Sequence, residues 1–241
     1  MPDTPDYSRY LPGSERYALA DLGELAARLG SPVTYDRRGE VLWMDACDGG
    51  IAAFSPSGSG TGNIVFLTTF FPFHGHYSLE MRAGSDGTRL SQVTKKLSHV
   101  SMLRSGLEVA FYLVSANESF GVRLLKFDGT NMIYGDISLF GTTELLCYLD
   151  SAGVYQTIVA TGGVADPYGI YHHIKIVVDF TTQKYVRALY NDAEYDLSGI
   201  ALRSEAAADI RQYRIRLRQT GRAGLNDIAR LGHVILTGNE P

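Results

Sequence analysis

The stretch 172–199, HHIKIVVDFTTQKYVRALYNDAEYDLSG, constrains the fold more than any other part of the chain. Over residues 174–180 every second residue is apolar and mostly polar residues stand between, which is the two-residue period of a half-buried strand. Short turn sequences then lead into two more alternating segments, 185–190 and 193–197. Three consecutive antiparallel strands form a meander, and a meander of this length is typical of a β-sandwich or a β-barrel.

The same alternation recurs along most of the chain and predicts a protein made largely of strands. Further strands are expected at 40–46, 50–54, 63–70, 76–83, 106–115, 120–127, 131–137, 144–150, 153–160, 211–219 and 228–237. Short helices are expected where the apolar spacing becomes helical or capping residues appear, at 21–30, 88–103 and 203–210. Residues 1–20 read as an extended lead-in. With 45% hydrophobic and 20% charged residues, we expect residues 1–241 to form one globular domain.

This pattern resembles the concanavalin A-like jelly roll of lectins, laminin G-type domains and β-glucanases. Residues 77–83, YSLEMRA, are similar to the glucanase strand with the sequence Tyr-x-x-x-Glu-x-Arg. Residues 173–199 resemble a hairpin of laminin G-type domains, and 233–241 resemble the last strand of such sandwiches. The resemblance implies an all-β antiparallel β-sandwich with a few short helices. It also implies a ligand that is a glycan or an oligosaccharide.

The comparison with β-glucanases speaks against a hydrolase. That family carries two carboxylates at alternating positions of one strand, as retaining hydrolysis requires. The strand after residues 77–83 offers only Glu108, and Ala110 stands where a second carboxylate is expected. A single carboxylate cannot perform a double displacement.

Alginate-type polysaccharide lyases offer a second comparison. Their strand Tyr-x-Lys-Ala-Gly-x-Tyr-x-Gln resembles residues 148–156, YLDSAGVYQ, in which Tyr155 would be the acid/base. The spacing is one residue too long, and Ser151 stands in place of the lysine. The segment 150–153 also reads as a hairpin turn, which would leave Tyr155 as an ordinary strand aromatic.

The remaining candidate residues each allow two interpretations. Trp43, the only tryptophan, could stack on a sugar ring or belong to the core. Arg214, Arg216 and Arg218 share one strand face, where they could hold an acidic glycan or balance acidic neighbours.

No metal centre is predicted from the histidines, although structural calcium is possible. The segment 74–76, His-Gly-His, could be half of a zinc site, but no second pair accompanies it, and His172 and His173 point to opposite faces of a strand. Calcium could bind acidic turns, which otherwise simply form turns: Asp45 with Asp48, Asp192 with Asp196, and Asn226 with Asp227.

Composition limits the partners and the compartment. A net charge of −4 lacks the electrostatic footprint of a nucleic-acid binder. No apolar run approaches the ~18 residues of a membrane span. No secretory signal is recognisable in the first twenty residues, so a cytoplasmic protein is expected. Cys47 and Cys147 are expected as buried free thiols, and the weakly charged strand 63–70 suggests a homodimer.

These observations favour a non-catalytic, carbohydrate-binding-like module without catalytic residues. Strand parity places Glu80, Arg82 and Glu108 on one sheet face, the concave face of the expected sandwich. Trp43 and Tyr155 are the aromatic residues that could join them. The alternative is a polysaccharide-processing enzyme, a lyase or a glycoside hydrolase, that uses the same face.

Overall fold

The computed structural model describes residues 36, 38–47, 50–73, 76–98, 103–163 and 170–241. The chain divides into two compact units, residues 1–37 and 38–241. The expected lead-in over 1–20 and the helix over 21–30 lie outside the described residues. The fold below is that of residues 38–241.

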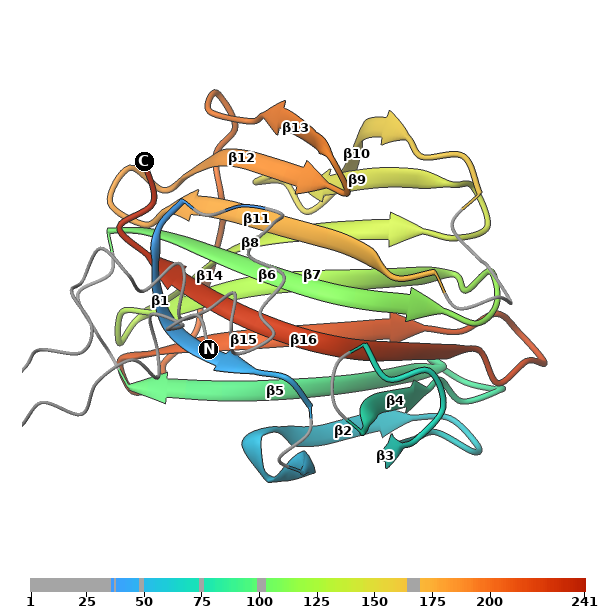
Figure 1. Ribbon diagram of the computed structural model, residues 1–241. Coiled ribbons are helices and arrows are strands. Elements are labelled where there is room, and N and C mark those ends of the chain that lie inside the picture. Colours follow the sequence, from blue (N-terminus) through green and yellow to red (C-terminus); the bar gives the residue numbers. More distant parts are fainter. Residues whose placement is uncertain (1–35, 37, 48–49, 74–75, 99–102, 164–169) are drawn as a thin grey trace, which may run out of the picture. The chain divides into compact units, whose positions relative to one another are not determined.

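Two antiparallel sheets pack face to face in this unit, as Figure 1 shows. The first sheet contains, in spatial order, β13 (Ala193–Asp196), β12 (Lys184–Tyr190), β11 (His172–Asp179), β6 (Arg104–Leu113), β16 (Ile228–Gly238), β4 (Ser78–Arg82) and β3 (Ile64–Thr68), and β1 (Glu40–Asp45) also pairs with β16. The second sheet contains β10 (Tyr155–Ala160), β9 (Leu145–Leu149), β8 (Asn131–Phe140), β7 (Ser119–Phe127), β15 (Gln212–Thr220), β5 (Leu90–Ser98) and β2 (Ser55–Ser59), and β14 (Arg203–Ala206) pairs with β8. The predicted all-β antiparallel sandwich is confirmed.

The hydrophobic core lies between the two sheets. On β6, Leu107, Val109 and Phe111 face it, and Ile174 and Ile176 of β11 face it from the neighbouring strand. Residues at the intervening positions therefore lie on the opposite side of each sheet, which we call its outer face. Burial of the inner side chains at roughly 25 cal/mol per Å² of apolar surface is the main source of stability.

Two of the expected helices are wrong. Within 88–103, the described residues form β5, and the spacing misled because Val93 and Leu97 are four residues apart, a spacing that puts two residues on one side of a helix or of a strand alike. The segment 203–210 begins with β14, whose Arg203 pairs with Tyr134 of β8, so sheet pairing overrides the helix propensity of its alanines. The expected strand at 50–54 is instead the short 3-10 turn η2 (Ile51–Ala53).

Several smaller predictions are confirmed. Cys47 and Cys147 are buried free thiols. The segment 150–153 is a hairpin turn between β9 and β10, closed by the hydrogen bond from the Gly153 N–H to the Asp150 carbonyl, 3.0 Å. Among the described residues, no helix has the length and apolar character needed to cross a bilayer.

Candidate functional site

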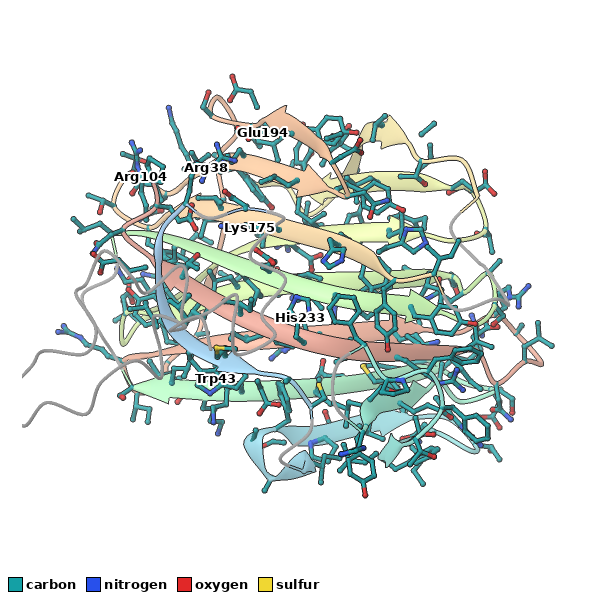
Figure 2. The ribbon with its side chains drawn as sticks, viewed as in Figure 1. Arg38, Trp43, Arg104, Lys175, Glu194 and His233 are labelled. Atoms are coloured by element: carbon teal, nitrogen blue, oxygen red, sulfur yellow. The ribbon has the colours of Figure 1, made fainter. Side chains whose placement is uncertain are left out.

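Charged and aromatic side chains gather on the outer face of the first sheet. The sequence-predicted residues Glu80, Arg82 and Glu108 all lie there, because their strands β4 and β6 alternate with core positions. Figure 2 labels His233 of β16 and Lys175 of β11, which belong to the same face. The face contains three groups of interacting side chains, described in turn below.

The first group joins one carboxylate to two imidazoles. Glu108 on β6, His173 on β11 and His233 on β16 place one ligand atom each within 4.8 Å of one another. The Nε2 atom of His233 is 3.8 Å from an oxygen of Glu108. Ala110 of β6 pairs in register with both histidines, so on β6 a methyl group stands between them. Ala110 stands where a second carboxylate is expected in a glucanase, and its small side chain leaves room for the two histidine rings.

A β-bulge brings His233 to this face. Leu231 pairs with Phe111 and His233 with the next residue, Ala110, so Gly232 is an extra residue in β16. If β16 ran through Gly232 as a regular strand, His233 would share the parity of Leu231 and point into the core. Glycine is also needed for close approach, because a Cβ atom there would lie 2.3 Å from the Cβ atom of Phe73.

Phe73 covers the two histidines. Its ring centroid is 5.4 Å from that of His173 and 5.0 Å from that of His233, and the two imidazole centroids are 5.7 Å apart. Glu108 and His233 are 2% and 1% exposed, whereas His173 is partly accessible. The group therefore lies beneath an apolar cover, with solvent reaching it on the His173 side.

The second group is a carboxylate held by two guanidiniums. Glu80 accepts a hydrogen bond from the Nε atom of Arg82, 2.6 Å, and another from the Nε atom of Arg230 on β16, 2.9 Å. Glu80 is buried, Arg230 nearly so, and Arg82 is about half exposed. The Arg82 guanidinium lies over the Phe66 ring at 5.0 Å.

Aromatic rings surround Arg230. The guanidinium carbon is 5.7 Å from the ring centroid of Tyr112, 5.8 Å from that of Phe70 and 5.9 Å from that of Phe71. Phe70 and Phe71 are 66% and 49% exposed, unusually open for such large apolar side chains. Burial raises the pKa of Tyr171, so its hydroxyl stays protonated and donates to the Phe71 carbonyl oxygen, 2.7 Å.

The third group is a buried ion network near the end of β16. The Nζ atom of Lys175 is 2.8 Å from an oxygen of Glu240, and both side chains are fully buried. Arg187 of β12 donates to the other oxygen of the same carboxylate, and Thr237 donates to the first, 2.5 Å. Gly106 leaves the space, because a Cβ atom there would lie 2.6 Å from that Glu240 oxygen. We interpret this closed network as structural.

Trp43 and Tyr155 lie away from this face. Trp43 packs against the edge of the core, edge-on to Phe54 with ring centroids 5.7 Å apart, and Lys95 lies over its ring. Tyr155 lies on the outer face of the second sheet, where its hydroxyl accepts hydrogen bonds from Arg218, 2.8 Å, and Ser138, 3.2 Å. The five sequence candidates therefore do not form one site.

The other candidates occupy the second sheet and the turns. Arg218 bonds Asp136, and Arg214 bonds Asp209, while Arg216 has no carboxylate partner among the described residues. Asp45 and Asp196 each accept a backbone N–H two residues later, the turn role expected of aspartate. Within the part of the chain that the structure describes, the one group of three metal-ligating side chains is that of Glu108, His173 and His233.

Comparison with known proteins supports the fold but assigns no family. No family model matches the chain, and no curated protein matches its sequence. Among solved structures, a glucuronan lyase from the fungus Trichoderma reesei has a TM-score of 0.54 and 10% identity over 83% of this chain and 96% of its own. The cellulose-induced protein Cip1 has a TM-score of 0.53 and 12% identity over 81% and 96%. A Bacillus licheniformis β-glucanase has a TM-score of 0.50 and 10% identity over 82% and 98%.

This chain has the concanavalin A-like lectin and glucanase fold. Identities of 10–12% show the fold alone and assign neither a ligand nor an activity, because this fold hosts both binding proteins and enzymes. Function must therefore be argued from the side chains of the outer face.

Proposed function

We propose that the outer face of the first sheet binds a glycan. The observation that carries the proposal is the pair of exposed rings, Phe70 and Phe71, beside the ion group of Glu80, Arg82 and Arg230. Exposed aromatic rings next to a fixed set of polar groups are the usual chemistry of a small-ligand site.

A sugar ring suits this combination. Its C–H face is apolar and can stack on an aromatic ring, and its hydroxyls exchange hydrogen bonds with planar polar groups. Arg82 is partly exposed and uses its Nε atom on Glu80, so its terminal nitrogens can donate to a ligand. Because Glu80 and the rings hold both guanidiniums, little side-chain entropy is lost on binding.

The names of proteins with a similar fold support the same ligand class by analogy. They include a cellulose-induced protein, a glucuronan lyase and a β-glucanase. This support is at the level of the fold and does not distinguish binding from catalysis.

Hydrolysis by a carboxylate pair is disfavoured by the sheet register. Glu80 lies level with Arg230 and Tyr112, and Glu108 lies four residues further along β6, with β16 between the two strands. With strands about 4.8 Å apart and about 3.4 Å per residue, their Cα atoms are roughly 17 Å apart. Retaining and inverting glycosidases need carboxylates about 5–5.5 Å and about 6.5–9.5 Å apart. A lyase remains the second candidate, because the imidazoles of His173 and His233 could accept a proton.

The test is a glycan array followed by titration calorimetry with the best ligand. We expect Phe70→Ala and Phe71→Ala each to weaken binding about fivefold, since one stacked ring contributes roughly 1 kcal/mol. Ile210→Ala is the matched control, because Ile210 is also highly exposed but lies two residues before β15 of the second sheet. Equal loss in the control, or no glycan binding at all, contradicts the proposal.

Turnover is measured on the same preparations. Incubation with uronate polymers, followed by ultraviolet absorbance of unsaturated product, distinguishes a lyase from a binding module. If the wild type forms new product and His173→Gln and His233→Gln do not, the protein is a lyase and not a non-catalytic binding module.

A further inference from the structure

We propose that Glu108, His173 and His233 form a binding site for a divalent transition metal, with zinc as the best match. The proposal goes beyond glycan binding. It concerns neighbouring side chains of the same face and is tested without any sugar.

The backbone places the three ligands on adjacent strands. Ala110 is the register partner of both histidines, and Glu108 is two residues before it on β6, so all three side chains project from one small area. Zinc ligands at about 2.0–2.2 Å in a tetrahedron stand roughly 3.4 Å apart. The present separations, 3.8 Å for His233 to Glu108 and up to 4.8 Å in the group, need shifts of about 1 Å, within reach of side-chain rotation.

The donor set selects the class of metal. Two imidazole nitrogens and one carboxylate oxygen suit zinc and its first-row neighbours, whereas calcium and magnesium prefer oxygen ligands. Three protein ligands leave a fourth position open, the arrangement of zinc sites that act on a ligand. The open side lies toward His173, the one member of the group that is partly accessible.

Burial favours an ion here. Glu108 and His233 are almost fully buried beneath Phe73, and a buried carboxylate is costly unless a cation faces it. A divalent ion held between the three groups offsets that cost. Lys175, the register partner of Glu108, places its ammonium 2.8 Å from Glu240.

Metal binding is measured on the full chain after treatment with a chelator. Titration calorimetry with zinc chloride, with metal analysis after dialysis, should give one tight ion per chain, and calcium chloride should not compete. His173→Gln, His233→Gln and Glu108→Gln should each weaken zinc at least about a hundredfold, because losing even a hydrogen-bond partner of a ligand costs about 10–100-fold. His76→Gln is the control, since His76 is exposed and is not one of the three residues of the group.

Cobalt provides a readout that needs no variant. Cobalt(II) bound to wild-type protein should give the visible absorption of a tetrahedral or five-coordinate site, and zinc should displace it. A wild-type protein that binds neither zinc nor cobalt at micromolar concentration overturns the proposal. So does binding that persists in all three variants while circular dichroism shows them folded. Glycan binding repeated with the chelator present separates the two proposals, because either can fail while the other stands.

Discussion

The two sheets bury charge on their outer faces in opposite ways. On the first sheet, carboxylates are buried among cations and imidazoles, as with Glu80 and Glu108. On the second sheet, Arg123, Arg214 and Arg218 pair with Asp136 or Asp209, and Arg216 has no carboxylate within ion-pair distance among the described residues. The second face is thus a packed ion layer with surplus positive charge. The first face carries the partly accessible groups and exposed rings that a ligand requires.

The sharpest contrast lies between the carboxylates of Asp136 and Glu108. Asp136 is fully buried and binds both Arg123, 2.6 Å, and Arg218, 2.8 Å. Asp136→Asn leaves two cations without their shared partner and should lower the free energy of unfolding by about 3–5 kcal/mol. Glu108→Gln should cost less in metal-free protein, since the amide that replaces the carboxylate is neutral and cheaper to bury. Urea denaturation of both variants checks this, and a larger loss for Glu108→Gln would remove the contrast.

A second contrast lies within the first sheet. Glu240 is buried between Lys175 and Arg187, whereas Glu194 pairs with Arg38 in the open, where both side chains are over a third exposed. Glu240→Gln should lower the free energy of unfolding by about 3 kcal/mol. Glu194→Gln should change it by less than about 0.5 kcal/mol, because water screens an exposed pair.

Thermal unfolding of the two glutamine variants at matched salt measures the difference. Similar midpoints would mean that the buried network around Glu240 contributes no more stability than the exposed pair of Glu194 and Arg38. Glycan binding should survive in both variants, since neither residue belongs to the proposed ligand group.

The surplus charge of the second sheet makes a prediction of opposite sign. Arg216 lies directly opposite Arg123 in the register, and burial together with Arg123 and Arg218 lowers the pKa of Arg216. Arg216→Met should therefore raise the free energy of unfolding by about 0.5–1 kcal/mol, because like charges directly opposite each other destabilise a sheet. The gain should shrink in high salt.

Arg214→Met is the control for this effect. Arg214 bonds Asp209 and lies over the Phe127 ring at 4.2 Å, so its loss should lower stability. If both variants lose stability, the second face has no surplus charge to relieve.

Strand alternation predicted the fold and part of the site from the sequence. It placed Glu80, Arg82 and Glu108 on one face because β4 and β6 are regular. It could not place His233, because one extra residue at Gly232 reverses the parity of everything after it. The glycine before a histidine in 228–237 was the available signal, since an isolated glycine in a strand often marks a bulge.

A bulge also decides the side to which Trp43 points. Val41 pairs with Thr237 and Trp43 with the adjacent Leu236, so Leu42 is an extra residue and Trp43 turns to the core. The aromatic cover by Phe71 and Phe73 comes from the segment between β3 and β4, and the contacts of such a connection follow from tertiary structure rather than from periodicity.

The smallest effect concerns association, and it also separates the two sheets. The edge strand β2 of the second sheet reads SPSGS, and proline and glycine discourage pairing with another chain. The edge strand β3 of the first sheet reads IVFLT, without any charge, and its Ile64 is half exposed. We therefore expect a homodimer through β3, and light scattering should give twice the chain mass of 26.4 kDa. Ile64→Lys should return the monomer mass with little change in stability, because the side chain already meets solvent, whereas Ser57→Lys in β2 should leave the mass unchanged. A monomer in the wild type at micromolar concentration would mean that the open edge of β3 is tolerated without a partner.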